Sequence, residues 1–357
     1  MAKTAEARPE RSTTRLHRSF EKIDSIASLR RHLQIAIELE AATIPPYLCA
    51  LYSIPDGQNR HASGIIRSVV VEEMLHIALA ANVLNAIDGH PQLNHAYMAP
   101  RYPVTLPHSE GDFEVGLRPF GKEAIKTFLK IERPGKPKAH PQADHYHSIG
   151  QFYVAIEEGL KTHAASPRAY TGKREYQVTS EYYYGSGRLV EVWNLETALK
   201  ALARIVDEGE GLDHTLFTTK KKFPAKWRDE NLAHYFRFKE VFYEHSYDPE
   251  RDNTHDPPSG PRLKVDWEAV YPMRVNPRME DYPVGSEIWN LSMDFSRTYM
   301  RLLNILDKGF NGHRETLVES VNVMYELKYR ALALMRIPFG EGTTAGPTFE
   351  YLPPASQ

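Results

Sequence analysis

The chain has 357 residues, and its 44 Lys and Arg against 46 Asp and Glu give a formal net charge of −2. The basic residues are scattered, which argues against a nucleic-acid-binding protein and against a surface for anionic membranes. A single cysteine, Cys49, excludes an internal disulfide, so stability has to come from packing.

The N-terminal residues have no apolar core. Residues 1–20 are rich in Arg, Thr and Glu, which does not match a secretory signal. No apolar run in the chain approaches the roughly 18 residues that span a bilayer. We therefore expect 1–20 to form a flexible arm, and the protein to stay in the cytoplasm without a membrane partner.

Hydrophobic periodicity predicts a largely helical chain. In chain order, the predicted helices cover 25–52, 62–88, 121–131, 148–163, 189–210, 230–245, 286–308 and 313–335. Prolines rule out a continuous helix over 91–120 and 246–284. The helix at 62–88 is apolar around most of its circumference, which is typical of the buried central helix of a bundle.

The first helix carries a glutamate on its apolar face. The face that begins at Leu29 and Leu33 continues with the same 4-3-4 spacing to Glu40. On a helical wheel Glu40 lies within about 20° of Leu29. Glu38 falls on the opposite side, so Glu40 is predicted to point inward and Glu38 outward.

The second helix repeats the pattern and adds a histidine. Glu73 occupies a core position of the apolar stripe, and His76 follows one turn later on the same side. Residues spaced i and i+3 on a helix can hold one ion together. Glu72 falls elsewhere on the wheel, so Glu73 and His76 are the predicted pair.

Three further polar residues border apolar faces in the later helices. Glu157 flanks the face of the 148–163 helix, and Glu210 lies at the edge of the stripe in the 189–210 helix, where Glu208 points away. His234 lies on the apolar side of the 230–245 helix. Glu157 is the least central of these candidates.

Inward carboxylates on several helices favour a metal site. A buried ionised carboxylate costs several kcal/mol unless it is paired or binds a metal. Mixed carboxylate and imidazole ligands suit iron, with manganese as the alternative. Two other interpretations stay open: Glu40 pairs with a core arginine such as Arg67 or Arg237, or His234 is an ordinary core histidine.

Aromatic and histidine residues near these positions offer further candidates. Tyr47, Tyr153 and Tyr235 flank the proposed ligands, where packing is the default interpretation and contact with reacting oxygen the alternative. We take Tyr47 and Glu157 as catalytic candidates, with Glu157 as a bridge or proton shuttle. The run from His140 to His147 is interpreted as a solvated loop, with a second metal site or a gate as the alternative.

Several of these segments resemble a known family. The segments 39–47, 72–76, 209–211 and 234–238 resemble the ferritin-like domain of the iminophenyl-pyruvate dimer synthase family, which acts in violacein and indolocarbazole pigment biosynthesis. The likeness covers roughly 25–245, and the tail at 344–350 resembles stand-alone members. Its most distinctive element contains Pro45 and Pro46, which should break a helix.

The resemblance implies a ferritin-like bundle with metal ligands at Glu40, Glu73, His76, Glu210 and His234. The chain departs from a symmetric pattern, because Glu210 and His234 are 24 residues apart instead of forming a second Glu-x-x-His. We therefore predict that the fourth bundle helix is broken at 209–211, and the number of metal ions stays open.

The predicted fold class is all-α, a ferritin-like four-helix bundle with long irregular insertions and an additional C-terminal helical pair. The predicted parts are the arm at 1–20, the metal-binding bundle at 21–245, a proline-rich wrapping segment at 246–285, and a helical pair with a tail at 286–357 that packs on the bundle.

The predicted function is that of a non-haem metal oxidase or oxygenase, with iron as the cofactor. Its partners would be O2 and a small amino-acid-derived or aromatic metabolite, in natural-product biosynthesis. The proline-rich segments would shape the substrate pocket. The alternatives are a metal-handling ferroxidase and a non-catalytic bundle used for binding. Nucleic acid is not an expected partner, and assembly into a homo-oligomer stays open.

Overall fold

The computed structural model describes residues 14–15, 22–106, 113–134, 149–185, 187–210, 232–248 and 251–353. In these ranges the helices are α1 (Ile26–Ser53), α2 (Arg60–Ala86), α3 (Lys122–Ile131), α4 (Ile149–His163), α5 (Leu195–Glu210), α6 (His234–Tyr243), α7 (Glu287–Phe310) and α8 (Leu317–Met335). The strands are β1 (Thr14–Arg15), β2 (Val104–Thr105) and β3 (Glu114–Val115). The all-α prediction is confirmed.

Each predicted helical range overlaps one of these helices, and the largest difference is at the start of α5. Periodicity predicts a start at residue 189, whereas α5 begins at Leu195. The side chain of Asn194 accepts a hydrogen bond from the Thr197 amide, at 2.9 Å. Asparagine in this position caps free amide groups of a first turn, so a local polar contact fixes the start that the apolar pattern placed too early.

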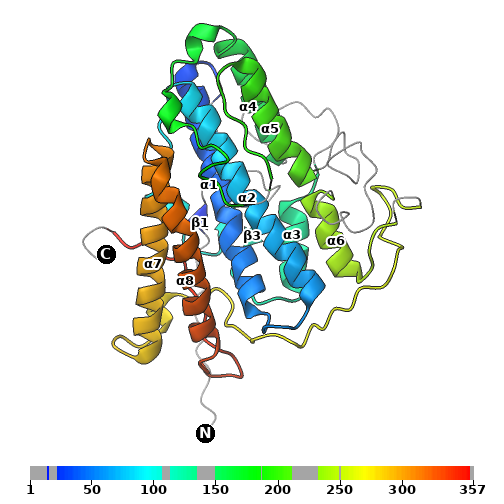
Figure 1. The fold of residues 1–357 in the computed structure, drawn as a ribbon. Coiled ribbons are helices and arrows are strands. Elements are labelled where there is room, and N and C mark those ends of the chain that lie inside the picture. Colours follow the sequence, from blue (N-terminus) through cyan, green and yellow to red (C-terminus); the bar gives the residue numbers. More distant parts are fainter. Residues whose placement is uncertain are drawn as a thin grey trace.

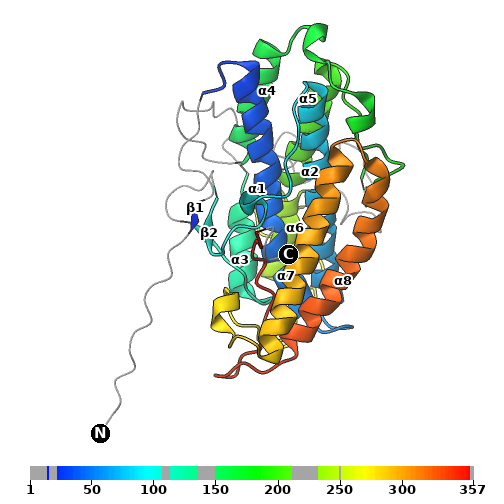
Figure 2. The same cartoon turned by 90° about the vertical axis from the view of Figure 1, so that its left-hand side faces the viewer.

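The helices form a four-helix bundle in which two of the four helices are each replaced by two shorter helices placed end to end. α1 and α2 lie along each other over their length, while α4 and α5 cover one half of them and α3 and α6 the other half (Figures 1 and 2). α3 and α4 therefore share the third position, and α5 and α6 share the fourth. α5 reaches Glu210, and 211–231 lie outside the described residues, so the predicted break at 209–211 stays a prediction.

α1 continues through both of its prolines, in agreement with the predicted helix over 25–52, although proline inside a helix ordinarily breaks it. Pro46 has no N–H to donate to the carbonyl of Ala42, four residues earlier. The hydroxyl of Tyr102 donates to that carbonyl instead, at 2.8 Å. A buried side chain thus replaces the backbone hydrogen bond that Pro46 cannot make.

We expect Tyr102→Phe to lower the free energy of unfolding by about 1–3 kcal/mol, because it leaves the buried carbonyl of Ala42 without a donor. Chemical denaturation measures this change. Tyr329→Phe is the matched control, since Tyr329 is 65% exposed, and should change stability by less than about 0.5 kcal/mol. Equal effects of the two variants would contradict the role given to Tyr102.

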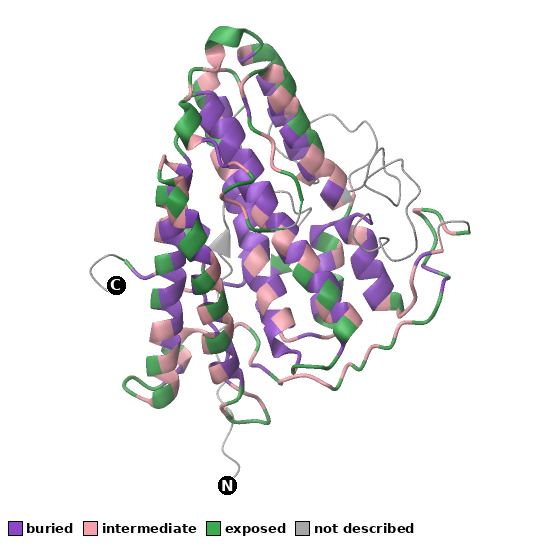
Figure 3. Ribbon diagram, in the orientation of Figure 1, coloured by how far each residue is buried: buried purple, intermediate pink, exposed green. Residues whose placement is uncertain are grey.

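Burial is greatest along α1 and α2, which are enclosed over most of their length (Figure 3). α7 and α8 pack on each other and beside α1 and α2, and the side chain of Asn85 in α2 donates to the carbonyl of Phe310, at 2.8 Å. Within the described residues, no helix combines the length and the apolar character that crossing a bilayer requires.

The other predicted segments are placed only in part. Of the predicted arm, Thr14 and Arg15 pair with β2, and 1–13 and 16–20 lie outside the described residues. The proline-rich segment contacts the turn between α1 and α2, where the amide of Tyr271 donates to the carbonyl of Ser53, at 2.8 Å.

Candidate metal centre

Two clusters of metal-ligand side chains lie in the core where the divided helices meet. Glu40, Glu73 and His76 form one cluster, and Glu73, Glu132 and His234 form the other. In each cluster the three potential ligand atoms lie within 4.8 Å of one another, and all of these residues are buried. Because both clusters contain Glu73, they form one continuous centre.

The bundle brings these residues together from four elements. Glu40 lies in the middle of α1, and Glu73 and His76 lie one turn apart on α2. Glu132 directly follows the last residue of α3, and His234 is the first residue of α6. The end of α3 and the start of α6 therefore lie beside Glu40 and Glu73 in the middle of the bundle.

Glu73 presents one oxygen to each cluster. Its Oε1 lies 3.1 Å from Nδ1 of His234, and its Oε2 lies 3.9 Å from Nδ1 of His76. The hydroxyl of Thr43 also donates to Oε2, at 3.3 Å. A carboxylate in this position can bridge two ions.

Both histidines are fixed through the nitrogen that faces away from the centre. Nε2 of His76 lies 3.0 Å from Glu208, and Nε2 of His234 lies 2.7 Å from Glu72. Such carboxylate contacts hold a metal-binding imidazole in one orientation and one tautomer. Nδ1 of each ring is thereby left facing Glu73.

Arginines neutralise these two outer carboxylates. Glu208 pairs with Arg204 at 2.6 Å, and Glu72 pairs with the fully buried Arg237 at 3.0 Å. Burial alone would raise the pKa of Glu72, but the charge of Arg237 and the contact with His234 lower it to about 2. Glu72 therefore stays ionised and accepts a hydrogen bond from Nε2 of the His234 imidazole.

Two buried tyrosines fix the remaining carboxylates. The hydroxyl of Tyr153 donates to Oε1 of Glu40 at 2.5 Å, and the hydroxyl of Tyr47 donates to Oε1 of Glu132. Burial and the nearby carboxylates raise the pKa of both tyrosines, so both keep their protons. The Oε2 atoms face the imidazoles, 3.6 Å from His76 for Glu40 and 3.5 Å from His234 for Glu132.

Burial and the nearby charges shift the pKa values of Glu73, Glu40 and His76 in the centre. Burial, followed by the charges of Glu132 and Glu40, raises the pKa of Glu73 well above its ordinary value. Burial would also raise the pKa of Glu40, but contact with His76 lowers it to about 2. His76 in turn has its pKa raised to about 10, because contacts with Glu208 and Glu40 outweigh its burial.

The donor set suits a divalent cation. Nδ1 of His234 is buried and has no hydrogen-bond partner among the described residues, although Glu73 is close to it. A cation between Glu73, Glu132 and His234 would use this nitrogen and offset the repulsion between the carboxylates. Carboxylate oxygens with imidazole nitrogens are ligands for iron or manganese.

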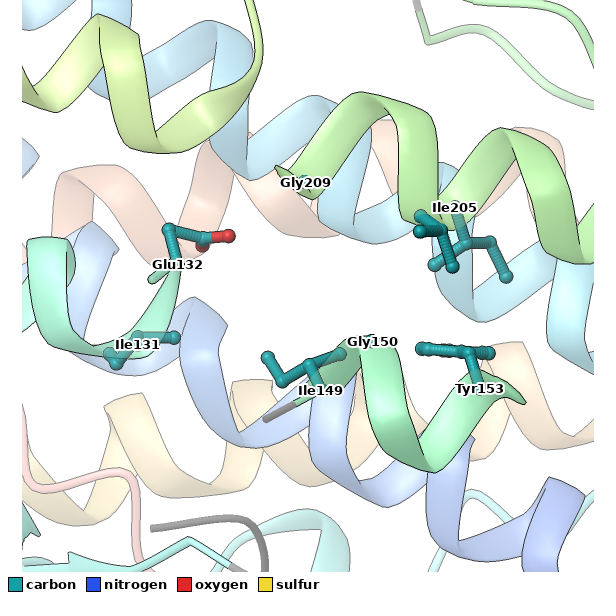
Figure 4. Close-up of a pocket in the computed structure, with 8 residues that line it drawn as sticks. Ile131, Glu132, Ile149, Gly150, Tyr153, Ile205 and Gly209 are labelled. Atoms are coloured by element: carbon teal, nitrogen blue, oxygen red, sulfur yellow. The ribbon is translucent and has the colours of Figure 1, made fainter. Parts of the chain in front are cut away.

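A small cavity adjoins the centre at the gap between α3 and α4. Ile131 and Glu132 lie on one side, and Gly150 and Tyr153 on the other (Figure 4). Its volume is about 20 Å³, which is enough for one water-sized molecule. The described part of the site therefore admits a molecule as small as water or O2 next to Glu132.

Four of the five predicted ligands, Glu40, Glu73, His76 and His234, lie together in the centre. Glu210 is the last residue of α5, and its side chain lies outside the described residues, so its role stays a prediction. Arg237 pairs with Glu72 instead of Glu40, which removes one of the alternative interpretations.

Glu132 was not predicted from the sequence. The predicted helix ended one residue before it, yet Ile125, Phe128 and Glu132 follow the same 3-4 spacing that identified Glu40. A wheel drawn one residue further would have placed Glu132 on the apolar face.

Glu157 does not lie in the centre. Its side chain is 41% exposed and pairs with Lys161 on the same helix, at 2.5 Å. The site side of α4 instead presents Tyr153, one turn earlier, to Glu40. The structure thus places the proposed bridge or proton shuttle on the surface, whereas Tyr47, the other catalytic candidate, contacts a cluster carboxylate.

The outward placement of Glu38 and Glu208 is wrong, and Glu72, which the wheel placed off the apolar stripe, is buried as well. Glu38 is 4% exposed, and Glu72 and Glu208 are each 8% exposed. A helical wheel assumes one buried face, but the segment that contains His95 covers Glu38, with Nε2 of His95 3.3 Å from its Oε1. α6 and α2 likewise cover Glu72 and Glu208, through His234 and His76.

Two other candidates lie away from the centre or beyond the described chain. Tyr235 is half-buried and stacks beside the ammonium group of Lys239, 5.7 Å from its ring centre. The run from His140 to His147 lies outside the described residues.

A protein-family model described as ferritin-like matches residues 33–243, which is more than half of the chain and includes the whole centre. This chain belongs to the ferritin-like family. It is 23% identical to a ferritin-like protein from Caulobacter vibrioides of known crystal structure, with a TM-score of 0.66 over 91% of this chain and 99% of that one. At this identity the likeness supports the shared fold.

Two curated relatives are much longer proteins. The chain is 24% identical to dichlorochromopyrrolate synthase from Lentzea aerocolonigenes, over 93% of this chain and 37% of the relative. It is 26% identical to 2-imino-3-(indol-3-yl)propanoate dimerase from Chromobacterium violaceum, over 53% of this chain and 21% of the relative. Both likenesses agree with the dimer synthase family that the motifs indicate.

Proposed function

We propose that this protein is a non-haem metal-dependent oxidase or oxygenase of natural-product biosynthesis that holds two iron ions, with manganese as the alternative metal. The observation that carries the proposal is the pair of buried clusters that share Glu73. A carboxylate from each of two elements, one Glu-x-x-His pair and a second histidine resemble the ligand pattern of di-metal helical bundles, although the second Glu-x-x-His of that pattern is missing here.

Each ligand has a defined place in this proposal. Glu40 and His76 would hold one ion, Glu132 and His234 the other, and Glu73 would bridge them. Glu210 is a further predicted ligand. Bound iron would supply the redox chemistry with O2 that amino-acid side chains cannot supply.

The surrounding residues hold the ligands and keep bulk water out. Tyr47 and Tyr153 each occupy one oxygen of Glu132 and Glu40, so the other oxygen stays directed at the centre. The adjoining cavity of about 20 Å³ is too small for an organic molecule, so it would admit O2 rather than the organic substrate.

The substrate class follows from the relatives. One of them is named for the dimerisation of 2-imino-3-(indol-3-yl)propanoate. Because this chain spans less than two fifths of either relative, we propose the class alone for it: small imino or amino acids with an aromatic side chain.

Oxygen consumption tests the proposal. Protein reconstituted with Fe(II) should consume O2 in addition to the O2 that an amino-acid oxidase and catalase consume while they generate an aromatic imino acid in situ, as measured against the same mixture without the protein. The Glu40→Gln variant should lose at least 90% of that substrate-dependent rate, while Glu157→Gln, whose side chain is exposed, should keep it. Consumption of O2 by Fe(II) alone, with no effect of any substrate, would indicate a ferroxidase instead.

Metal uptake should release protons and strengthen as pH rises. Contacts with carboxylates raise the pKa of His76 to about 10 and that of His234 well above its ordinary value. Both rings are therefore protonated near pH 7, and a metal has to displace the proton from Nδ1. We expect release of at least one proton per bound ion, measured with an indicator dye in weak buffer. Uptake without proton release, and an affinity that does not change between pH 6 and 8, would contradict the ligand assignment.

A further inference from the structure

A second cavity, unlike the one at the metal centre, lies between the bundle and the α7–α8 pair. Its volume is about 890 Å³, within the range of pockets that bind small organic molecules. We propose that this cavity binds an amphipathic organic anion: a carboxylate on an aromatic or aliphatic body larger than one amino acid.

The walls of the cavity are apolar and come from both parts of the chain. α1 and α2 contribute Leu48 and Met74, and α7 and α8 contribute Leu306 and Met324. All four side chains are half-buried, so they keep accessible surface although they face into the protein. Apolar surface left in contact with water costs about 25 cal/mol per Å², which favours an apolar occupant.

The helical pair is attached in a way that leaves this space open. At one end the carbonyl of Phe310 accepts from Asn85, at 2.8 Å, and at the other Lys328 lies 3.9 Å from Asp56. Polar contacts thus hold the pair near both ends of the cavity. Between them the apolar faces of α8 and α2 line the cavity from opposite sides.

The charged residues of the lining favour an anion, because Asp56 lies 3.9 Å from Lys328 and two arginines remain. Arg60 and Arg67 lie two turns apart on α2 and line the cavity. Among the described residues, neither has a carboxylate within ion-pair distance. Arginine binds carboxylates through paired hydrogen bonds. Apolar walls with free guanidinium groups suit a molecule that has an apolar body and an anionic end.

This cavity is separate from the metal centre. Val70, Met74 and Ile77 of α2 line the cavity, whereas Glu73 and His76 of the same helix face the ligands on α1 and α6. The two sites therefore lie on different faces of α2. Binding in the cavity does not require metal, so its failure would be distinguishable from failure of the proposed oxidase activity.

Fluorescence titration of metal-free, full-length protein tests the proposal with two probes. 1-Anilinonaphthalene-8-sulfonate represents aromatic anions, and cis-parinaric acid represents aliphatic carboxylates. We expect saturable binding of one molecule per chain for at least one probe, and the tighter probe identifies the body that the cavity prefers. No saturable binding of either probe would overturn the proposal.

Matched variants locate the binding. Met324→Trp should fill the cavity and weaken binding at least tenfold, whereas Val318→Trp, on the exposed side of the same helix, should not. Arg67→Gln should weaken binding of the tighter probe about tenfold. It should not change binding of a neutral ester of that probe. Arg297→Gln is the control and should leave binding of the probe unchanged. Circular dichroism and thermal unfolding establish that each variant is folded.

Two outcomes would count against the proposal even if probe binds. Binding that Met324→Trp leaves unchanged would place the probe elsewhere. The other outcome is a dimer, seen by sedimentation, that binds no probe and that Met324→Trp dissociates. This result would identify the cavity as an interface between copies of the chain.

Discussion

Replacing Glu73 with glutamine should abolish tight metal binding and yet stabilise the metal-free protein. Glu73 is buried between Glu40 and Glu132, which raise its pKa. A glutamine at this position keeps the shape and hydrogen-bonding capacity of the side chain but cannot carry the charge that holds two cations. We expect metal bound per chain to fall by at least 90%, measured by mass spectrometry of the metal after dialysis.

The stability effect has a defined pH dependence. A raised pKa means that the folded state holds the Glu73 proton more tightly than the unfolded chain, so stability is lost as pH rises from about 4 through the raised pKa. Metal-free Glu73→Gln should be more stable than the parent at pH 7–8, by about 1–2 kcal/mol. The difference should vanish near pH 4.

Glu157→Gln is the control for this experiment, because it removes an exposed carboxylate of the same type. It should leave both metal content and the pH dependence of stability unchanged. If metal-free Glu73→Gln were less stable than the parent at pH 8, the like-charge crowding inferred for the centre would be wrong.

Replacing Arg237 with methionine should be the most destabilising of the single substitutions considered. Arg237 is fully buried and makes two contacts to Glu72, at 3.0 and 3.1 Å, and one to the carbonyl of Leu232, at 2.6 Å. Its loss leaves a buried carboxylate with His234 as its remaining cationic partner. We expect the free energy of unfolding to fall by about 3–5 kcal/mol, measured by denaturant titration.

A double substitution separates lost charge pairing from lost packing. Glu72→Gln together with Arg237→Met should recover at least about 1 kcal/mol of the loss, because no unpaired charge remains. Arg301→Met is the surface control, because the ion pair between Arg301 and Glu326 is exposed to solvent. It should lower the free energy of unfolding by less than about 1 kcal/mol. A double variant no more stable than Arg237→Met alone would show that the pairing with Glu72 is not what Arg237 contributes.

Arg237→Met should also weaken metal binding. Glu72 orients His234 through Nε2, at 2.7 Å, and Arg237 fixes Glu72. Loss of such an outer partner typically reduces metal affinity 10–100-fold. A variant that is destabilised but binds metal normally would restrict Arg237 to a structural role.

The sequence predicted the helices well because their apolar periodicity is strong. It correctly predicted that the first helix continues through Pro45 and Pro46, but it did not identify the donor that replaces the missing backbone hydrogen bond, which is Tyr102, far away in the chain. No local pattern indicates such a contact. The predicted start of α5 was too early, because a single capping residue, Asn194, outweighs the apolar periodicity.

For the centre, a helical wheel identified the clustered side chains that lie within or begin helices. It failed for Glu132, which follows the last residue of α3, and for Glu72 and Glu208, which support the histidines from a second buried face. A helical wheel identifies one buried face of a helix, whereas these helices are buried on several faces. Glu157 was chosen because α4 was expected to supply the fourth carboxylate, which comes from the end of α3 instead.

Two adjoining ion sites bridged by Glu73 are the central feature proposed for this protein. Anaerobic titration of metal-free protein with Co(II), followed by its visible absorption, counts the ions directly. We predict two ions per chain, with both lost in Glu73→Gln. A stoichiometry of one ion per chain that survives Glu73→Gln, or no stable binding of Co(II), Fe(II) or Mn(II), would contradict the bridged pair.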